Sequence, residues 1–222
     1  MTHTDHHADH AGHHRAEPED PTQFWEQHYG QRDQIWSGHA NAGLVARVEG
    51  MAPGRALDLG CGEGGDAVWL AQQGWQVTAV DISQTAFGRA RSLAQRAGVE
   101  SAISFERHSL GESFPAGTFD LVSLQFLQSP VDLPAETILR QAAAAVAPDG
   151  SLLVIDHGAI PPWSDHEEPE GGFPSPQETW ASTGAAADDW TVVEMGLVER
   201  EATRPDGQTG VLIDAVVLAR RR

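Results

Sequence analysis

Short apolar runs alternate with helix-like segments along most of the chain. In the intervening segments the apolar residues recur every three to four positions, most clearly at 84–97, where Phe87, Ala90 and Leu93 share one stripe. Strands that alternate with helices indicate a parallel sheet covered by helices on both faces. We therefore predict a doubly wound α/β domain. Its parallel strands are expected at 56–59, 75–80, 103–107, 119–124 and 151–156.

The pattern changes after residue 158. Residues 159–175 are irregular and rich in proline, and a stretch of this kind inside a domain is usually functional or mobile, so we predict a lid over a binding site. A helix is expected at 177–187. Strand-like segments follow at 190–194, 198–201 and 211–218, and the last two flank the turn Pro205-Asp206-Gly207. The pattern therefore predicts that the chain ends in a closing β-hairpin.

The N-terminal part divides into a tail and a cap. Residues 1–20 carry six histidines among acids and small residues. Such a segment has too little apolar surface to become ordered by burying it. We predict a disordered tail with weak divalent metal binding and no dedicated metal site. A metal-responsive tail, a merely solubilising one and an artificial addition remain open. Residues 21–222 form the predicted domain, which opens with a helical cap at 21–50.

The charge and the cysteine content limit which classes of partner and which cellular compartment the sequence is compatible with. The formal net charge of −18 disfavours nucleic acid and anionic membranes, because the summed field repels phosphate. The single Cys61 excludes an internal disulfide and fits a reducing compartment. No apolar run approaches the roughly 20 residues of a membrane helix. We expect a cytoplasmic protein without membrane or nucleic-acid partners, and monomer and dimer remain equally open.

The strongest chemical signal lies at 56–81, which reads ALDLGCGEGGDAVWLAQQGWQVTAVD. Its glycines let the backbone turn sharply and approach a ligand closely. Asp66 is expected as the N-cap of the following helix. Asp81 ends the second strand, at the sheet edge where open parallel sheets bind small molecules. The stretch therefore predicts a βαβ unit that holds a ligand.

Two ligands compete for this unit. Gly60, Gly62 and Gly65, with Asp81 about 20 residues further on, fit the dinucleotide fingerprint of an NAD(P)-dependent oxidoreductase. Asp58, however, stands inside the first strand, where an acid would repel a pyrophosphate. S-adenosylmethionine (SAM) has no phosphate and carries a sulfonium and an amino group, so Asp58 favours SAM.

The string DLGCGEG followed by VDIS resembles the motif of class I SAM-dependent methyltransferases. The segment WEQHYGQRDQIWSGHAN resembles the N-terminal cap of small bacterial methyltransferases related to the tellurite-resistance and thiopurine groups. This resemblance, which covers residues 21–222, implies a Rossmann-like seven-stranded sheet with an antiparallel last strand and SAM as the cofactor.

The resemblance also implies a set of cofactor contacts. Asp81 is expected to bind the ribose hydroxyls, and Arg32 the cofactor carboxylate. Ser109 stands where the family usually has an acid for the adenine amino group, so this contact falls to Ser109 or to the backbone beside it. The full implied set comprises Asp58, Gly60, Cys61, Gly62, Gly64, Asp81, Ile82, Ser109, Leu110, Leu124, Gln125, Arg32 and Trp36.

The methyl acceptor is less well defined. The Asn-Pro-Pro-Tyr type of clamp used on nucleic acid or protein amines is absent after the strand at 119–124, which favours a small-molecule acceptor. His157 and Tyr29 are the candidate general bases. Since neither is unambiguous, a soft sulfur or selenium acceptor is mildly favoured over oxygen or nitrogen. A non-enzymatic, metal-responsive binding protein that acts through its histidine tail is the remaining alternative.

Overall fold

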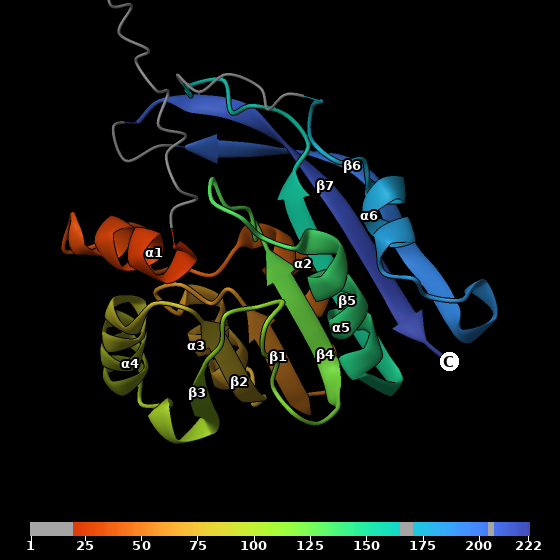
Figure 1. Cartoon of the computed structure of the whole chain (residues 1–222), viewed down its shortest axis with the longest axis horizontal. Coiled ribbons are helices and arrows are strands. Elements are labelled where there is room, and N and C mark those ends of the chain that lie inside the picture. Colours follow the sequence, from red (N-terminus) through yellow and green to blue (C-terminus); the bar gives the residue numbers. More distant parts are fainter. Residues whose placement is uncertain (1–19, 165–170, 204–206) are drawn as a thin grey trace, which may run out of the picture.

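A mixed seven-stranded sheet organises the part of the chain that the structure describes, residues 20–164, 171–203 and 207–222 of a computed structural model (Figure 1). The strand order is β3-β2-β1-β4-β5-β7-β6. The first five strands are mutually parallel, and β7 is antiparallel to both β5 and β6. The strands are β1 Arg55–Leu59, β2 Gln76–Asp81, β3 Ile103–Arg107, β4 Phe119–Gln125, β5 Val146–His157, β6 Trp190–Thr203 and β7 Thr209–Arg221. The predicted doubly wound sheet with an antiparallel end is confirmed.

Helices cover both faces of this sheet. They are α1 Pro21–Gly30, α2 Ala42–Val48, α3 Gly65–Gln72, α4 Gln84–Ala97, α5 Ala135–Ala145 and α6 Pro176–Ser182, with short 3₁₀ turns η1 Glu100–Ala102 and η2 Ala187–Asp189. In the described ranges, no helix is long and apolar enough to cross a membrane.

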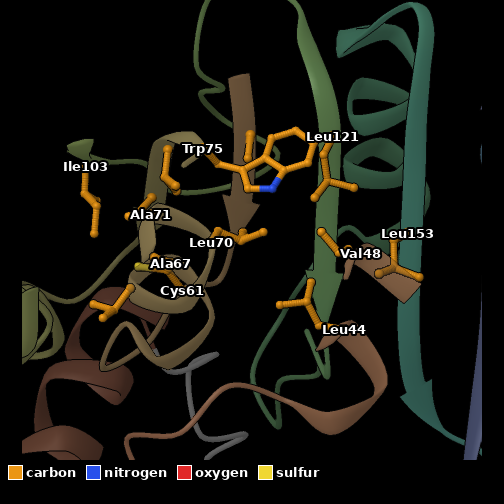
Figure 2. Packing of buried hydrophobic residues seen from close by; sticks show 14 of the residues in the cluster. Leu44, Val48, Cys61, Ala67, Leu70, Ala71, Trp75, Ile103, Leu121 and Leu153 are labelled. Atoms are coloured by element: carbon orange, nitrogen blue, oxygen red, sulfur yellow. The ribbon is translucent and has the colours of Figure 1, made fainter. Parts of the chain in front are cut away.

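Two apolar clusters form the core, one on each face. On the first face, side chains of α2 and α3 such as Leu44 and Leu70 pack toward Leu121 and Leu153 of the sheet (Figure 2). On the second face, Ile138 of α5 belongs to the other cluster. Because both faces are covered, the central strands are apolar almost throughout.

The carboxyl ends of β1, β2, β4 and β5 meet at one edge of the sheet, called here the C-terminal edge. Helix α1 and the segment leading into α2 lie at this edge (Figure 1). The topological switch falls between β1 and β4, on either side of which the chain winds in opposite directions. Open α/β sheets bind ligands at such a point. The predicted helical cap is therefore placed where it can cover a ligand.

Strands β6 and β7 continue past this edge as a two-stranded arm. β5 pairs with β7 only as far as His157↔Asp214, whereas β6 and β7 stay paired to Thr203↔Thr209. A Cβ at Gly210 would lie 2.6 Å from Cζ3 of Trp163, so the start of the predicted lid packs on the arm. Residues 165–170 of that lid, like the tail at 1–19, lie outside the described residues.

Two element predictions were wrong in their bounds. The segments expected at 190–194 and 198–201 are one strand, because β7 pairs continuously with residues 195–197 as well. The register shifts only within the first segment, between Val192 and Glu194. The helix expected at 177–187 ends at Ser182. There the Thr183 hydroxyl donates to the carbonyl of Trp180, and Gly184 takes a positive φ of 65°.

Candidate functional site

The glycine turn joins β1 to α3 at the C-terminal edge. Gly60, Gly62 and Gly64 have positive φ angles of 74°, 50° and 84°. The amides of Gly60 and Cys61 both donate to the carbonyl of Val80 at 2.8 Å. A Cβ at Gly62 would lie 3.0 Å from the Tyr29 hydroxyl, so the turn needs glycine both for its backbone angles and for the close approach of the cap.

Asp81 binds the turn to the start of α4. Its Oδ2 accepts from the Gly62 amide and its Oδ1 from the Ser83 amide, both at 2.9 Å. The carboxyl group is buried, and burial raises its pKa, against the effect of these donors. Asp81 therefore holds the glycine turn and the second strand end in one arrangement.

Asp58 is the most deeply buried acid of the site, with 2% of its surface exposed. Its Oδ2 has no hydrogen-bond partner among the described residues. Burial raises the pKa of Asp58 well above its usual range, and the neighbouring charges of Asp66 and Asp81 add to this effect. A ligand that brings a hydrogen-bond donor or a positive charge to this buried carboxyl group would stabilise it.

Asp66 does not cap α3, contrary to the sequence prediction. Gly64 is the N-cap in a left-handed conformation, and Asp66 lies in the first helical turn. Its two oxygens accept from the backbone amide of Asn41 at 2.6 Å and from the Asn41 side chain at 2.8 Å. The positive φ of Gly64 starts the helix two residues early, which leaves Asp66 to attach the cap.

A buried ion pair forms the second attachment of the cap. Glu63 accepts from the amides of Ile35 and Trp36 at 3.0 and 2.8 Å and pairs with Arg89 Nη1 at 2.5 Å. Arg89 Nη2 donates to the carbonyl oxygens of Tyr29 and Arg32. These contacts of Glu63 and Arg89 with the cap, called here the latch, were not predicted from the sequence. Its one local signal is the charged Glu63 inside a turn of small residues.

Helix α1 is also fixed to α4. The Glu26 carboxylate accepts from the amide of Gln84 and from the amide and hydroxyl of Thr85, at the N-terminus of α4. An acid at this helix end satisfies amides that have no partner within the helix. This contact was likewise not predicted from the sequence.

The predicted cap residues differ in their burial. Tyr29 is buried and accepts a hydrogen bond from Trp36 Nε1 at 3.3 Å. Burial raises the pKa of the phenol, which is therefore protonated at neutral pH, and its role as a base stays a prediction. Trp36 is 53% exposed, and Arg32 is exposed and bonded here through its carbonyl oxygen. The cofactor contacts expected of both also remain predictions.

The other predicted cofactor residues lie at neighbouring strand ends. The His108 amide donates to the carbonyl of Asp81 at 3.2 Å and so joins the ends of β2 and β3, where Ile82 and Ser109 stand. Leu124 and Gln125 are buried at the end of β4, and Leu110 packs on the second core cluster. Burial raises the pKa of the Cys61 thiol well above its usual range, so this thiol stays protonated. The fold thus brings the predicted residues to one edge of the sheet.

Aromatic rings surround His157 at the end of β5. The Phe126 and Phe173 ring centroids lie 4.7 and 6.1 Å from the imidazole. Phe126 takes a positive φ of 51°, which is unusual for a residue with a bulky side chain. Burial lowers the pKa of His157, so the imidazole is neutral at pH 7 and can accept a proton.

The neighbouring Asp156 should make stability depend on pH. Burial raises its pKa to about 6, against one hydrogen bond from the His157 amide. A folded-state pKa above the unfolded value means that the native state holds the extra proton below about pH 6, so stability falls as the pH rises from about 4 through 6. We expect Asp156→Asn to be about 1–2 kcal/mol more stable than the parent at pH 8, less than the full shift because water still reaches the group.

Urea unfolding at pH 5, 6.5 and 8 measures this difference. Asp149→Asn is the matched control, because Asp149 lies in the same strand but is 81% exposed and sits at a φ of 62° that asparagine tolerates. Equal pH profiles for the parent and Asp156→Asn would contradict the expectation.

Part of the chain that forms this site matches a known family model. Residues 56–150 match the model of the family described as "Methyltransferase domain". Among curated proteins, the 27-O-demethylrifamycin SV methyltransferase of Amycolatopsis mediterranei is 33% identical over 151 residues, 58% of this chain and 55% of that protein. The ribosomal RNA small subunit methyltransferase C of Chromohalobacter salexigens is 32% identical over 111 residues, 48% of this chain and 32% of that protein. The chain thus spans about half the length, or less, of these relatives.

Solved structures show the same fold at lower identity. A protein from work on the conversion of a disulfide bond into a thioacetal group during echinomycin biosynthesis has a TM-score of 0.66 and 24% identity, covering 91% of this chain and 92% of that one. The N-methyltransferase NodS of Bradyrhizobium japonicum, solved with S-adenosylhomocysteine (SAH), gives 0.64 and 18%, covering 91% and 99%. TehB of Haemophilus influenzae gives 0.62 and 17%, covering 82% and 63%. These similarities establish the α/β Rossmann-like methyltransferase fold.

Proposed function

We propose that this chain uses SAM to methylate a small-molecule acceptor, since residues 56–150 match the model of a methyltransferase domain. The single observation that carries the proposal is the acidic lining of the glycine turn. Asp58 is the last residue but one of β1 and Asp81 ends the neighbouring β2; both are buried, and an oxygen of Asp58 has no partner among the described residues. This lining fits a cationic ligand and opposes a pyrophosphate, so SAM is favoured over NAD(P).

The residues present fit SAM. Asp81 would accept from the ribose hydroxyls, and Asp58 would interact, directly or through water, with the amino group. A Cβ at Gly62 would crowd the Tyr29 hydroxyl at 3.0 Å, as expected of a turn that a ligand and a cap approach closely. When bound, SAM supplies a methyl group already activated by its sulfonium.

The chain itself then has two tasks. It must hold the acceptor in line with the methyl group, and it must exclude water while the transfer occurs. The cap, fixed by Glu63 and Asp66, serves the second task at the turn. Gln125, Phe126 and His157 stand at the ends of β4 and β5, beside the cofactor strands, and are proposed to face the acceptor.

A small acceptor is supported by the net charge of the chain. The net charge of −18 repels nucleic-acid phosphates, although one curated relative acts on ribosomal RNA by name. Relation to the tellurite-resistance and thiopurine groups remains part of the proposal. The fold shared with TehB supports it only at the level of architecture.

Isothermal titration with SAH, with NADH as the control ligand, tests the cofactor. We expect micromolar binding of SAH and none of NADH, because only SAH brings an ammonium group and no phosphate to the acidic turn. Binding of NADH alone would establish the oxidoreductase alternative. Binding of neither would leave the fold as a scaffold and move a non-enzymatic role to first place.

A further inference from the structure

A charged pair stands directly opposite His157 at the C-terminal edge. His157 of β5 is aligned with Asp214 of β7, and the next pair along carries the backbone hydrogen bond from Gly158 to Ile213 at 2.8 Å. Aligned residues of antiparallel strands alternate between hydrogen-bonded and non-hydrogen-bonded pairs. His157 and Asp214 therefore form a non-hydrogen-bonded pair, whose side chains share one face and approach most closely.

Asp214 is placed to act on a neighbour. It is 4% exposed, its Oδ2 accepts from Arg200 Nε at 2.5 Å, and its Oδ1 has no hydrogen-bond partner among the described residues. Arg200 of β6 is partly exposed, so it neutralises the buried acid from the solvent side. Asp214 thus keeps one buried oxygen without a hydrogen-bond donor among the described residues, at the position paired with His157.

The charged groups that act on His157 come from all three strands. Asp214 favours the imidazolium, Arg200 opposes it, and Asp156 accepts the His157 backbone amide. Phe126 and Phe173 bring no charge and limit the access of water to the ring. The imidazole is therefore neutral before the reaction, and Asp214 stabilises the imidazolium that forms when it takes up a proton.

We propose that His157 is the general base of the methyl transfer, that Asp214 is its positioning residue, and that the acceptor is a hydroxyl on an apolar, planar molecule. This inference rests on the proposed function. A thiolate needs no base, whereas a hydroxyl must lose its proton as it attacks. The sequence named His157 as a candidate base but showed no partner for it, because residues 157 and 214 become neighbours only through the strand register.

As the acceptor oxygen forms its bond to the methyl carbon and the bond from that carbon to sulfur breaks, His157 takes the hydroxyl proton. The products are a methyl ether, SAH and an imidazolium stabilised by Asp214. The imidazolium then releases its proton to water, which returns the site to its starting state.

The first test needs no acceptor. NMR titration of the histidine ring signals in the full chain, with the His157 signal assigned by its absence in His157→Asn, measures the His157 pKa. We expect Asp214→Asn to lower this pKa by about 1 unit, because an opposite charge is lost and Arg200 is left unpaired. Glu194→Gln is the matched control, since it breaks the Arg47–Glu194 ion pair of the same strand β6 at a distance from His157. An unchanged pKa in Asp214→Asn would overturn the pairing.

The second test compares catechol with thiophenol as acceptors, which offer an oxygen and a sulfur nucleophile on the same ring. We expect catechol methylation to rise with pH along a limb that reports His157, and His157→Asn to lower the rate about 100-fold at pH 7 with SAH affinity unchanged. Asp214→Asn should shift this limb to lower pH. Methylation of thiophenol alone, at a rate that His157→Asn leaves unchanged, would overturn the hydroxyl assignment. If the parent protein does not bind SAH, the proposed function itself is refuted.

Discussion

Asp81→Ala is expected to weaken SAH binding by about 1–3 kcal/mol, or roughly 10- to 100-fold. In the proposed complex, the alanine would leave the ribose hydroxyls without their acceptor. It also releases the amides of Gly62 and Ser83, so that the glycine turn loses the contact that orders it against β2. Both effects weaken binding.

Calorimetry on the variant measures this loss. Asp120→Ala is the matched control, because the Asp120 carboxylate also accepts a backbone amide, that of Arg55 at 2.7 Å, but at the opposite edge of the sheet. The control should bind SAH as the parent does. An unchanged SAH affinity in Asp81→Ala would mean that the cofactor does not lie where we place it.

Arg89→Ala is expected to cost the largest share of stability, about 2–4 kcal/mol. Removing one partner of a buried ion pair leaves the other charge uncompensated, which usually costs about 3–5 kcal/mol. Glu63 has only 5% of its side chain exposed, whereas 23% of Arg89 is exposed and Glu63 keeps two amide donors, so we expect less than the full range. The carbonyl oxygens of Tyr29 and Arg32 lose their donor as well.

Urea unfolding measures the loss, and stopped-flow release of SAH should be faster because the cap is less firmly held. Arg140→Ala removes an exposed pair with Glu136 on α5 and should change stability by less than about 0.5 kcal/mol. Adding Glu63→Gln to Arg89→Ala should recover part of the loss, since the buried charge is then gone. Stability of Arg89→Ala within the range of the control would show that the latch contributes nothing.

The sequence by itself determined the order of the elements and the cofactor edge. Apolar runs and helical stripes are local, so the five parallel strands, the stripe of α4 and the glycine turn could be predicted from neighbouring residues. Asp58 and Asp81 could be placed at this edge for the same reason, because strand ends fall at one edge of a parallel sheet whatever the remaining contacts are.

Only the tertiary structure decided what holds the cap and what surrounds His157. Glu63 and Arg89 stand 26 residues apart, and both α6 and β6 lie between His157 and Asp214 in the chain. Such pairs depend on strand register and on how helices pack, which local periodicity does not encode. The same reason explains Asp66, which the sequence placed as a cap but which the left-handed Gly64 and the loop at Asn41 turn into an attachment point. Chemistry that lies on one strand end is visible in the sequence, whereas chemistry shared between distant strands becomes visible only when the sheet forms.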